Sequence, residues 1–115
     1  MDAHDLLDIE RRLVATVEEM HKLTSAVAMS RQVKEFVGDQ RKNLLAKYVA
    51  PHLKDGSATA AETLARANEQ YQAELTVLAD QYRTAEKHIA KWDALHCQLD
   101  AFRSSLSLGK EMSKL

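Results

Sequence analysis

The feature that most constrains how this chain folds is a long apolar repeat in its second half. From Tyr71 to Leu99, apolar and aromatic residues follow one another in alternating steps of four and three, a 3.5-residue spacing that holds for four heptads. This spacing keeps one seam of a helix facing a partner helix and is typical of a coiled coil. The predicted seam, our candidate core of a hairpin or dimer, comprises Tyr71, Leu75, Leu78, Tyr82, Ala85, Ile89, Trp92, His96 and Leu99, reaches Arg103 beside Phe102, and resumes at Leu106.

The first half of the chain carries a second apolar stripe, which predicts one helix over about residues 3–50. Asp2 is placed to cap the first turn, and Pro51 makes further helix unfavourable. Two segments are candidate kinks: Thr24 to Ser30, where the stripe loses a member, and Gly38. The stripe consists of Leu6, Ile9, Leu13, Val17, Met20, Leu23, Val27, Val33, Val37, Leu44 and Tyr48.

Between the two stripes, the sequence predicts a polar loop over residues 51–58. Gly56 can adopt the positive φ that a tight turn requires. Thr59 and Glu62 have the spacing of a capping box, which predicts a short helix over about 59–67.

A long helix over about 69–109 completes the predicted fold. Asn68 can cap its start, and Gly109 lets its end fray. Strands are not expected, because helix-favouring residues dominate and only 5% of the chain is aromatic. Two long helices joined by a tight elbow predict a single all-α domain, residues 1–115, built as a long antiparallel coiled-coil-like hairpin with a short helix at the elbow.

A hairpin of this length buries one stripe per helix and therefore has a thin core. We expect a homodimer in a four-helix arrangement, and the alternative is a monomer whose first helix folds back at Ser30. Apolar residues beside the main stripes widen the apolar face accordingly: Leu7, Val14, Phe36, Leu45 and Leu95.

The composition predicts a soluble cytoplasmic protein. No apolar run approaches the roughly 20 residues that span a bilayer, and the amino terminus is acidic, unlike a signal peptide. The single cysteine excludes an intramolecular disulfide and suits a reducing compartment. We interpret Cys97 as a buried structural thiol and not as a metal ligand or nucleophile.

The motifs of an enzyme are missing from the sequence. Five histidines are present, but neither an HExxH motif, a paired-cysteine motif nor a phosphate-binding glycine loop occurs. Most of the acidic residues stand within three or four positions of a Lys or Arg, which surface ion pairing explains. We therefore expect no catalytic residues, no cofactor and no metal.

Two seam residues have alternative interpretations. Trp92 fits the heptad spacing and is interpreted as a core or dimer anchor in preference to a ligand-stacking residue. Arg103 either extends past Phe102 to solvent or pairs with an amino-terminal Asp, which would fix the register of the hairpin.

The most promising candidate site is a basic run over residues 31–54. The net charge is only −1, but residues 1–20 are rich in Asp and Glu whereas this run is rich in Lys and Arg. A solvated helix face would explain such a run; the functional interpretation is contact with nucleic-acid phosphates or a partner. The candidate contact residues are Arg31, Lys34, Arg41, Lys42, Lys47 and Tyr48.

A further indication comes from a resemblance over Asp39 to Leu106, just over half of the chain. The stretches DQRKNLLAKYVAPHL, AAETLARANEQYQAEL, QYRTAEKHIAKWDAL and AFRSSLSL resemble small helical proteins of bacteriophage and prophage early regions, some encoded near recombination and replication genes. The resemblance supplies no catalytic motif. It implies an accessory protein in the cytoplasm of a bacterial host.

Three functions follow as hypotheses, all of them non-enzymatic. The first is a dimeric accessory factor for phage DNA recombination or replication that binds a protein partner and single- or double-stranded nucleic acid. The second is an inhibitor of a host defence or DNA-processing protein that acts through the acidic segment Asp2 to Glu19. The third is a structural coiled-coil scaffold.

Overall fold

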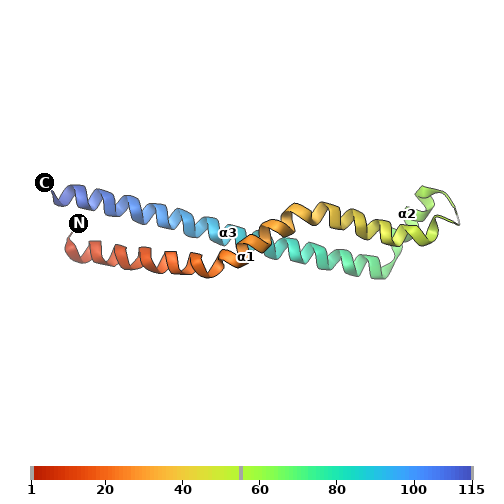
Figure 1. The fold of residues 1–115 in the computed structure, drawn as a ribbon, viewed down its shortest axis with the longest axis horizontal. Coiled ribbons are helices and arrows are strands. Elements are labelled where there is room, and N and C mark those ends of the chain that lie inside the picture. Colours follow the sequence, from red (N-terminus) through yellow and green to blue (C-terminus); the bar gives the residue numbers. More distant parts are fainter. Residues whose placement is uncertain (1, 55, 115) are drawn as a thin grey trace. The chain divides into compact units, whose positions relative to one another are not determined.

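The computed structural model describes residues 2–54 and 56–114, without the side chain of Ser113, and these residues are almost entirely helical (Figure 1). The elements in chain order are α1 (Ala3–Val49), the 3₁₀-helix η1 (Ala50–His52), α2 (Ala58–Ala67) and α3 (Glu69–Ser113). No strand occurs in the described residues, so the prediction of an all-α chain is confirmed. None of the helices over the described residues is long and apolar enough to cross a membrane.

A polar cap and a proline explain where α1 begins and ends. The Asp2 Oδ1 atom accepts a hydrogen bond of 2.9 Å from the amide of Asp5, which caps the first turn as predicted. At the other end, Pro51 lies in η1 and α1 stops at Val49. Neither candidate kink interrupts the helix, because α1 runs through Ser30 and Gly38.

The short helix α2 is capped two residues earlier than predicted. Ser57 is the cap residue, and its Oγ atom accepts a hydrogen bond of 3.2 Å from the amide of Ala60. Thr59 lies inside the helix, so the predicted capping box with Glu62 is wrong. Gly56 does not take a positive φ, which corrects the expected turn geometry.

Asn68 caps α3, as predicted. Its Oδ1 atom accepts hydrogen bonds from the amides of Gln70 and Tyr71, at 2.8 and 3.1 Å. The helix continues to Ser113 instead of fraying at Gly109, which is buried.

The chain divides into two compact units that share both long helices. Unit 1 contains Met1–Ala28 and Lys87–Leu115, and unit 2 contains Met29–Glu86. In each unit a segment of α1 runs antiparallel to a segment of α3 (Figure 1). That the whole chain is one hairpin domain stays a prediction.

The core of unit 1 is a small cluster along the seam between its two helix segments. Met20, Leu95 and Leu99 are 7%, 8% and 6% exposed and pack together. Leu13, Leu23 and Trp92 are half-buried against them. Trp92 therefore has the core position that its heptad spacing predicted.

Unit 2 is closed near its turn by aromatic and small residues. Tyr71 is buried, and its ring meets that of Tyr48 edge-on, with the ring centroids 5.6 Å apart. Short Ala61 and Ala65 side chains are buried in α2, which contacts η1. Small residues on the inner face let this short helix pack closely.

The predicted seams are one residue out of register at two places. In α1, Thr16 is buried whereas Val17 is 42% exposed, although valine is the more apolar residue. In α3, Leu95 is buried and His96 is exposed. Ile89, Trp92 and Leu95 make two successive steps of three, so the heptad repeat is interrupted where the prediction continued it.

Two further expectations are corrected by this register. Ser30, which was expected to be a gap in the α1 stripe, is only 4% exposed and is a seam residue. Cys97 is exposed, so the interpretation as a buried thiol is wrong. It lies two residues after the buried Leu95 and therefore points away from the seam.

Candidate anion-binding groove

Four of the predicted contact residues share one side of α1 in unit 2. Arg31, Lys34, Arg41 and Lys42 are exposed and follow one another at helical spacings of three, seven and one. At about 100° per residue, the four side chains lie within about 100° of one another around α1. Lys34 and Arg41 are nearest the α3 seam, and Arg31 and Lys42 are turned further toward solvent. We call these four residues the basic strip.

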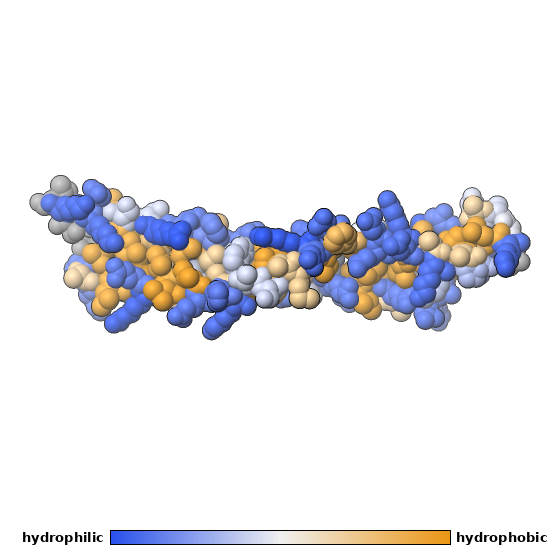
Figure 2. Space-filling model, in the orientation of Figure 1, coloured by the Kyte–Doolittle hydropathy of each residue, from blue (hydrophilic) through white to orange (hydrophobic). Residues whose placement is uncertain are grey.

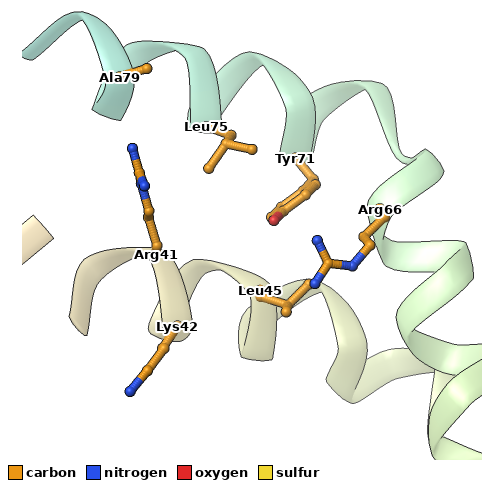
Figure 3. Close-up of a pocket in the computed structure, with 7 residues that line it drawn as sticks. All are labelled: Arg41, Lys42, Leu45, Arg66, Tyr71, Leu75 and Ala79. Carbon is orange, nitrogen blue, oxygen red and sulfur yellow. The ribbon is translucent and has the colours of Figure 1, made fainter. Parts of the chain in front are cut away.

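The α3-facing part of the basic strip borders an open groove of about 470 Å³, all of it within unit 2. Leu45, Tyr71, Leu75 and Ala79 supply its apolar lining. The cationic lining residues are Arg41 and Lys42 from α1 and Arg66 from α2. In Figure 3, Arg41 extends toward α3 and Arg66 extends over Leu45 and Tyr71, while Lys42 points away from α3.

Arg66 is a groove residue that the sequence prediction missed. It belongs to α2, outside the basic run of α1, and only the fold brings it beside Arg41. Its Nη2 and Nε atoms donate to Glu62 Oε1 at 2.8 and 3.1 Å, and this hydrogen bond raises the pKa of Arg66. The four-residue spacing of Glu62 and Arg66 signals the ion pair but not the groove.

Two predicted contact residues, Lys47 and Tyr48, are engaged elsewhere. Tyr48 Oη donates a hydrogen bond of 2.6 Å to Glu74 Oε2, and Lys47 Nζ lies 3.5 Å from Glu74 Oε1. The Glu74 hydrogen bond raises the pKa of Tyr48 to about 12 and lowers the pKa of Glu74. Both side chains thus tie α1 to α3, and neither lines the groove.

The far end of the basic strip is more open. Lys34 Nζ lies 5.7 Å from the centroid of the Tyr82 ring, a cation–π contact that orients the lysine along α3. A Cβ atom at Gly38 would meet nothing within 4 Å, so the helix surface between Lys34 and Arg41 is unobstructed. A ligand can approach the backbone closely there.

The chemistry that these residues offer is binding of anions. Guanidinium groups present planar arrays of donors that match phosphate and carboxylate oxygens, and they stay charged at any physiological pH. Across the described residues, no three or more His, Cys, Asp or Glu side chains gather in a way that could hold a metal ion.

The acidic amino-terminal segment, in unit 1, is largely engaged within the unit. Asp2 and Asp5 cap one another, Asp8 pairs with Arg12 at 3.1 Å, and Glu19 pairs with Lys91 at 3.2 Å. Arg103, predicted either to meet an amino-terminal Asp or to reach solvent, is exposed and makes no ion pair within the described residues.

Comparison with known proteins adds no relative. No protein-family model matches the chain, and no curated protein or solved structure matches it either.

Proposed function

We propose that this is a non-catalytic binding protein that holds the phosphate backbone of a nucleic acid along the basic strip of unit 2. One observation carries the proposal: cationic side chains from two different helices, Arg41 and Lys42 of α1 and Arg66 of α2, border one groove (Figure 3). Local charge, more than the net charge of −1, determines where an anionic polymer is attracted.

The surroundings of the groove favour backbone contacts over base contacts. Tyr71 is only 5% exposed, and the Tyr48 ring contacts the Tyr71 ring and has Lys47 Nζ 5.4 Å from its centroid, so neither ring offers a free face for stacking bases. The basic strip covers about 17 Å of α1 from Arg31 to Lys42, at 1.5 Å per residue, which is enough for several phosphates. Binding of this kind is sequence-independent and sensitive to salt.

The proposal also includes the arrangement of the whole chain and its place in the cell. The whole chain is taken as an antiparallel hairpin that forms a homodimer with four helices, and its place is the cytoplasm. The resemblance to phage early-region proteins suggests an accessory role in DNA recombination or replication, with a protein partner on the same nucleic acid.

A second candidate occupant is an acidic amphipathic helix of a partner protein. The apolar floor formed by Leu45, Leu75 and Ala79 favours it, because a bare nucleic-acid backbone gains little from aliphatic side chains. Such a helix would place apolar residues on that floor and carboxylates against Arg41 and Arg66.

The two other hypotheses have less support. An inhibitor that acts through the acidic segment would rely on carboxylates that are mostly engaged within unit 1, as with Asp8 and Glu19. A scaffold requires neither the groove nor the basic strip, and no contact in the described residues favours it.

Charge reversal tests the groove directly. We expect Arg41→Glu with Lys42→Glu to weaken binding of labelled duplex and single-stranded oligonucleotides at least about tenfold in fluorescence anisotropy, because repulsion replaces two phosphate contacts. Circular dichroism should show unchanged helicity, since both side chains are exposed.

A matched control uses Arg11→Glu with Lys87→Glu, which makes the same change in net charge on exposed positions of unit 1. It should retain most of the affinity. An equal loss of affinity in both variants would show that net charge alone explains the effect. Binding that is unaltered by Arg41→Glu with Lys42→Glu would contradict the proposal. Wild-type protein that binds neither oligonucleotide would leave the acidic helix as the occupant.

A further inference from the structure

The two flanks of unit 1 differ in character. On one flank, Glu19 and Lys91 form an ion pair at 3.2 Å beside a hollow that Glu18 and Lys22 also line. On the other flank, Val17, His21 and Thr24 of α1 and Arg103 of α3 surround a hollow of about 260 Å³ whose floor is Met20, Trp92 and Leu99. We call this second side the apolar flank.

Exposed apolar residues extend the apolar flank along α1. Val14 and Val17 are 54% and 42% exposed, and Leu7, seven residues before Val14, is 45% exposed. Steps of seven and three keep these three side chains on one side of the helix. Figure 2 shows apolar surface beside charged surface over the unit that contains both chain ends.

The core beneath this flank is incompletely covered. Among the described residues no large side chain is fully buried, and Trp92 in unit 1 stays partly exposed although it packs against Leu95 and Leu99. Two helices alone leave such a core open on its flanks, whereas four helices enclose it.

The exposed charges on the apolar flank are of opposite sign on its two helices. Glu10 is exposed three residues after Leu7, on the same side of α1, and Arg103 is exposed on the α3 side of the hollow. Leu95 and Leu99 pack against Met20, so Arg103, one turn beyond Leu99, lies near the level of Val14 in this antiparallel pair. Each copy therefore offers a carboxylate on one helix and a guanidinium on the other, within about one helical turn in height.

We propose that the apolar flank of unit 1 binds the same flank of a second copy, with α1 of each copy on α3 of the other. A two-fold axis parallel to the helices produces this arrangement and pairs Glu10 of each copy with Arg103 of its partner. The other symmetric choice, with α1 on α1 and α3 on α3, places Glu10 and Arg103 on different helix pairs, so the two charges do not meet across the interface. The inference deepens the proposed homodimer and is independent of the groove in unit 2.

Charge-reversed single variants test the pairing. We expect the wild-type chain, 12.9 kDa, to show twice that mass by analytical ultracentrifugation at low salt. Glu10→Arg alone and Arg103→Glu alone should each shift the protein to the monomer mass, because like charges then face each other across the interface.

Mixing the two single variants is the decisive step. A Glu10→Arg chain carries two arginines at the paired positions and an Arg103→Glu chain carries two glutamates, so a mixed pair is complementary at both contacts. We expect the mixture to recover the dimer mass. A change confined to one chain's own fold cannot produce this recovery, and a mixture that stays monomeric would overturn the proposal.

Apolar variants complete the experiment. Val14→Lys should dissociate the dimer, whereas Leu108→Lys should not, since Leu108 lies about 140° around α3 from Arg103. Both residues are exposed, at 54% and 62%, so neither change should unfold the chain. A dimer that persists in Val14→Lys and in both charge-reversed variants would exclude this flank as the interface but not the homodimer itself. A wild-type chain with the monomer mass would exclude both the interface and the homodimer, and would not affect the nucleic-acid proposal.

Discussion

Glu74 joins the two helices of unit 2 through one carboxylate that serves two partners. Its oxygens accept from Tyr48 Oη at 2.6 Å and lie 3.5 Å from Lys47 Nζ. The folded state holds the Tyr48 proton more tightly than the unfolded chain, so this stabilisation is complete below the ordinary pKa of 10.0 and is lost as the pH rises through about 12. The lowered pKa of Glu74 acts at the acidic end: its stabilisation is present above the ordinary value of 4.5 and is lost as the pH falls through the lowered value.

Tyr48→Phe removes the hydrogen bond while keeping the ring. Between the ordinary pKa values of 4.5 for Glu74 and 10.0 for Tyr48, we expect the variant to have a lower free energy of unfolding than wild type. The difference should shrink at more acidic and at more alkaline pH. Urea titrations followed by circular dichroism at several pH values would measure it. A difference that is equal at every pH would contradict this role for the Tyr48–Glu74 hydrogen bond.

At the scale of elements, the start of α3 depends on a single side chain. Asn68 Oδ1 accepts from two amides of the first turn, so Asn68→Ala leaves both without that partner. We expect the free energy of unfolding to fall by about 1 kcal/mol, measured by urea denaturation. Asn43→Ala, at an exposed position inside α1, is the matched control and should cost nothing, because alanine favours the helix interior. Equal effects of the two substitutions would argue against the cap.

The helices were predictable because strong local signals mark their ends. Pro51 stops α1 and Asn68 caps α3, and both act through the backbone of their immediate neighbours. Register was less predictable. Thr16 is buried in place of Val17 because its hydroxyl donates to the Arg12 carbonyl of its own helix, at 2.8 Å, which removes the cost of burying it. A prediction of the buried face from hydrophobicity alone therefore selects Val17 instead of Thr16.

The candidate site was only partly predictable for a related reason. Arg41 and Lys42 stand out within the basic run of α1, and the structure places both at the groove. Arg66 joins them only through the turn that brings α2 to η1, and Tyr48 leaves the set because its partner Glu74 is on α3. Contacts between segments far apart in the sequence determine the positions of Arg66 and Tyr48. The distribution of charge along one helix does not reveal such contacts.

At the scale of the whole molecule, the two units have different proposed tasks. Unit 2 carries the basic strip, with Arg41 and Arg66 at its groove, and unit 1 carries the apolar flank with Val14 and Arg103. A homodimer would therefore carry two grooves on one particle. Two linked sites raise the affinity for a long nucleic acid above that for a short one, when one molecule can reach both.

The most direct test of the proposed nucleic-acid function is the salt dependence of oligonucleotide binding, measured by fluorescence anisotropy between about 50 and 200 mM salt. If three to five cations of the strip and groove meet phosphates, the logarithm of the duplex association constant should fall against the logarithm of salt with a slope of roughly −3 to −5. Binding that is unaffected by salt, or no binding at the lowest salt, would contradict a phosphate-binding role.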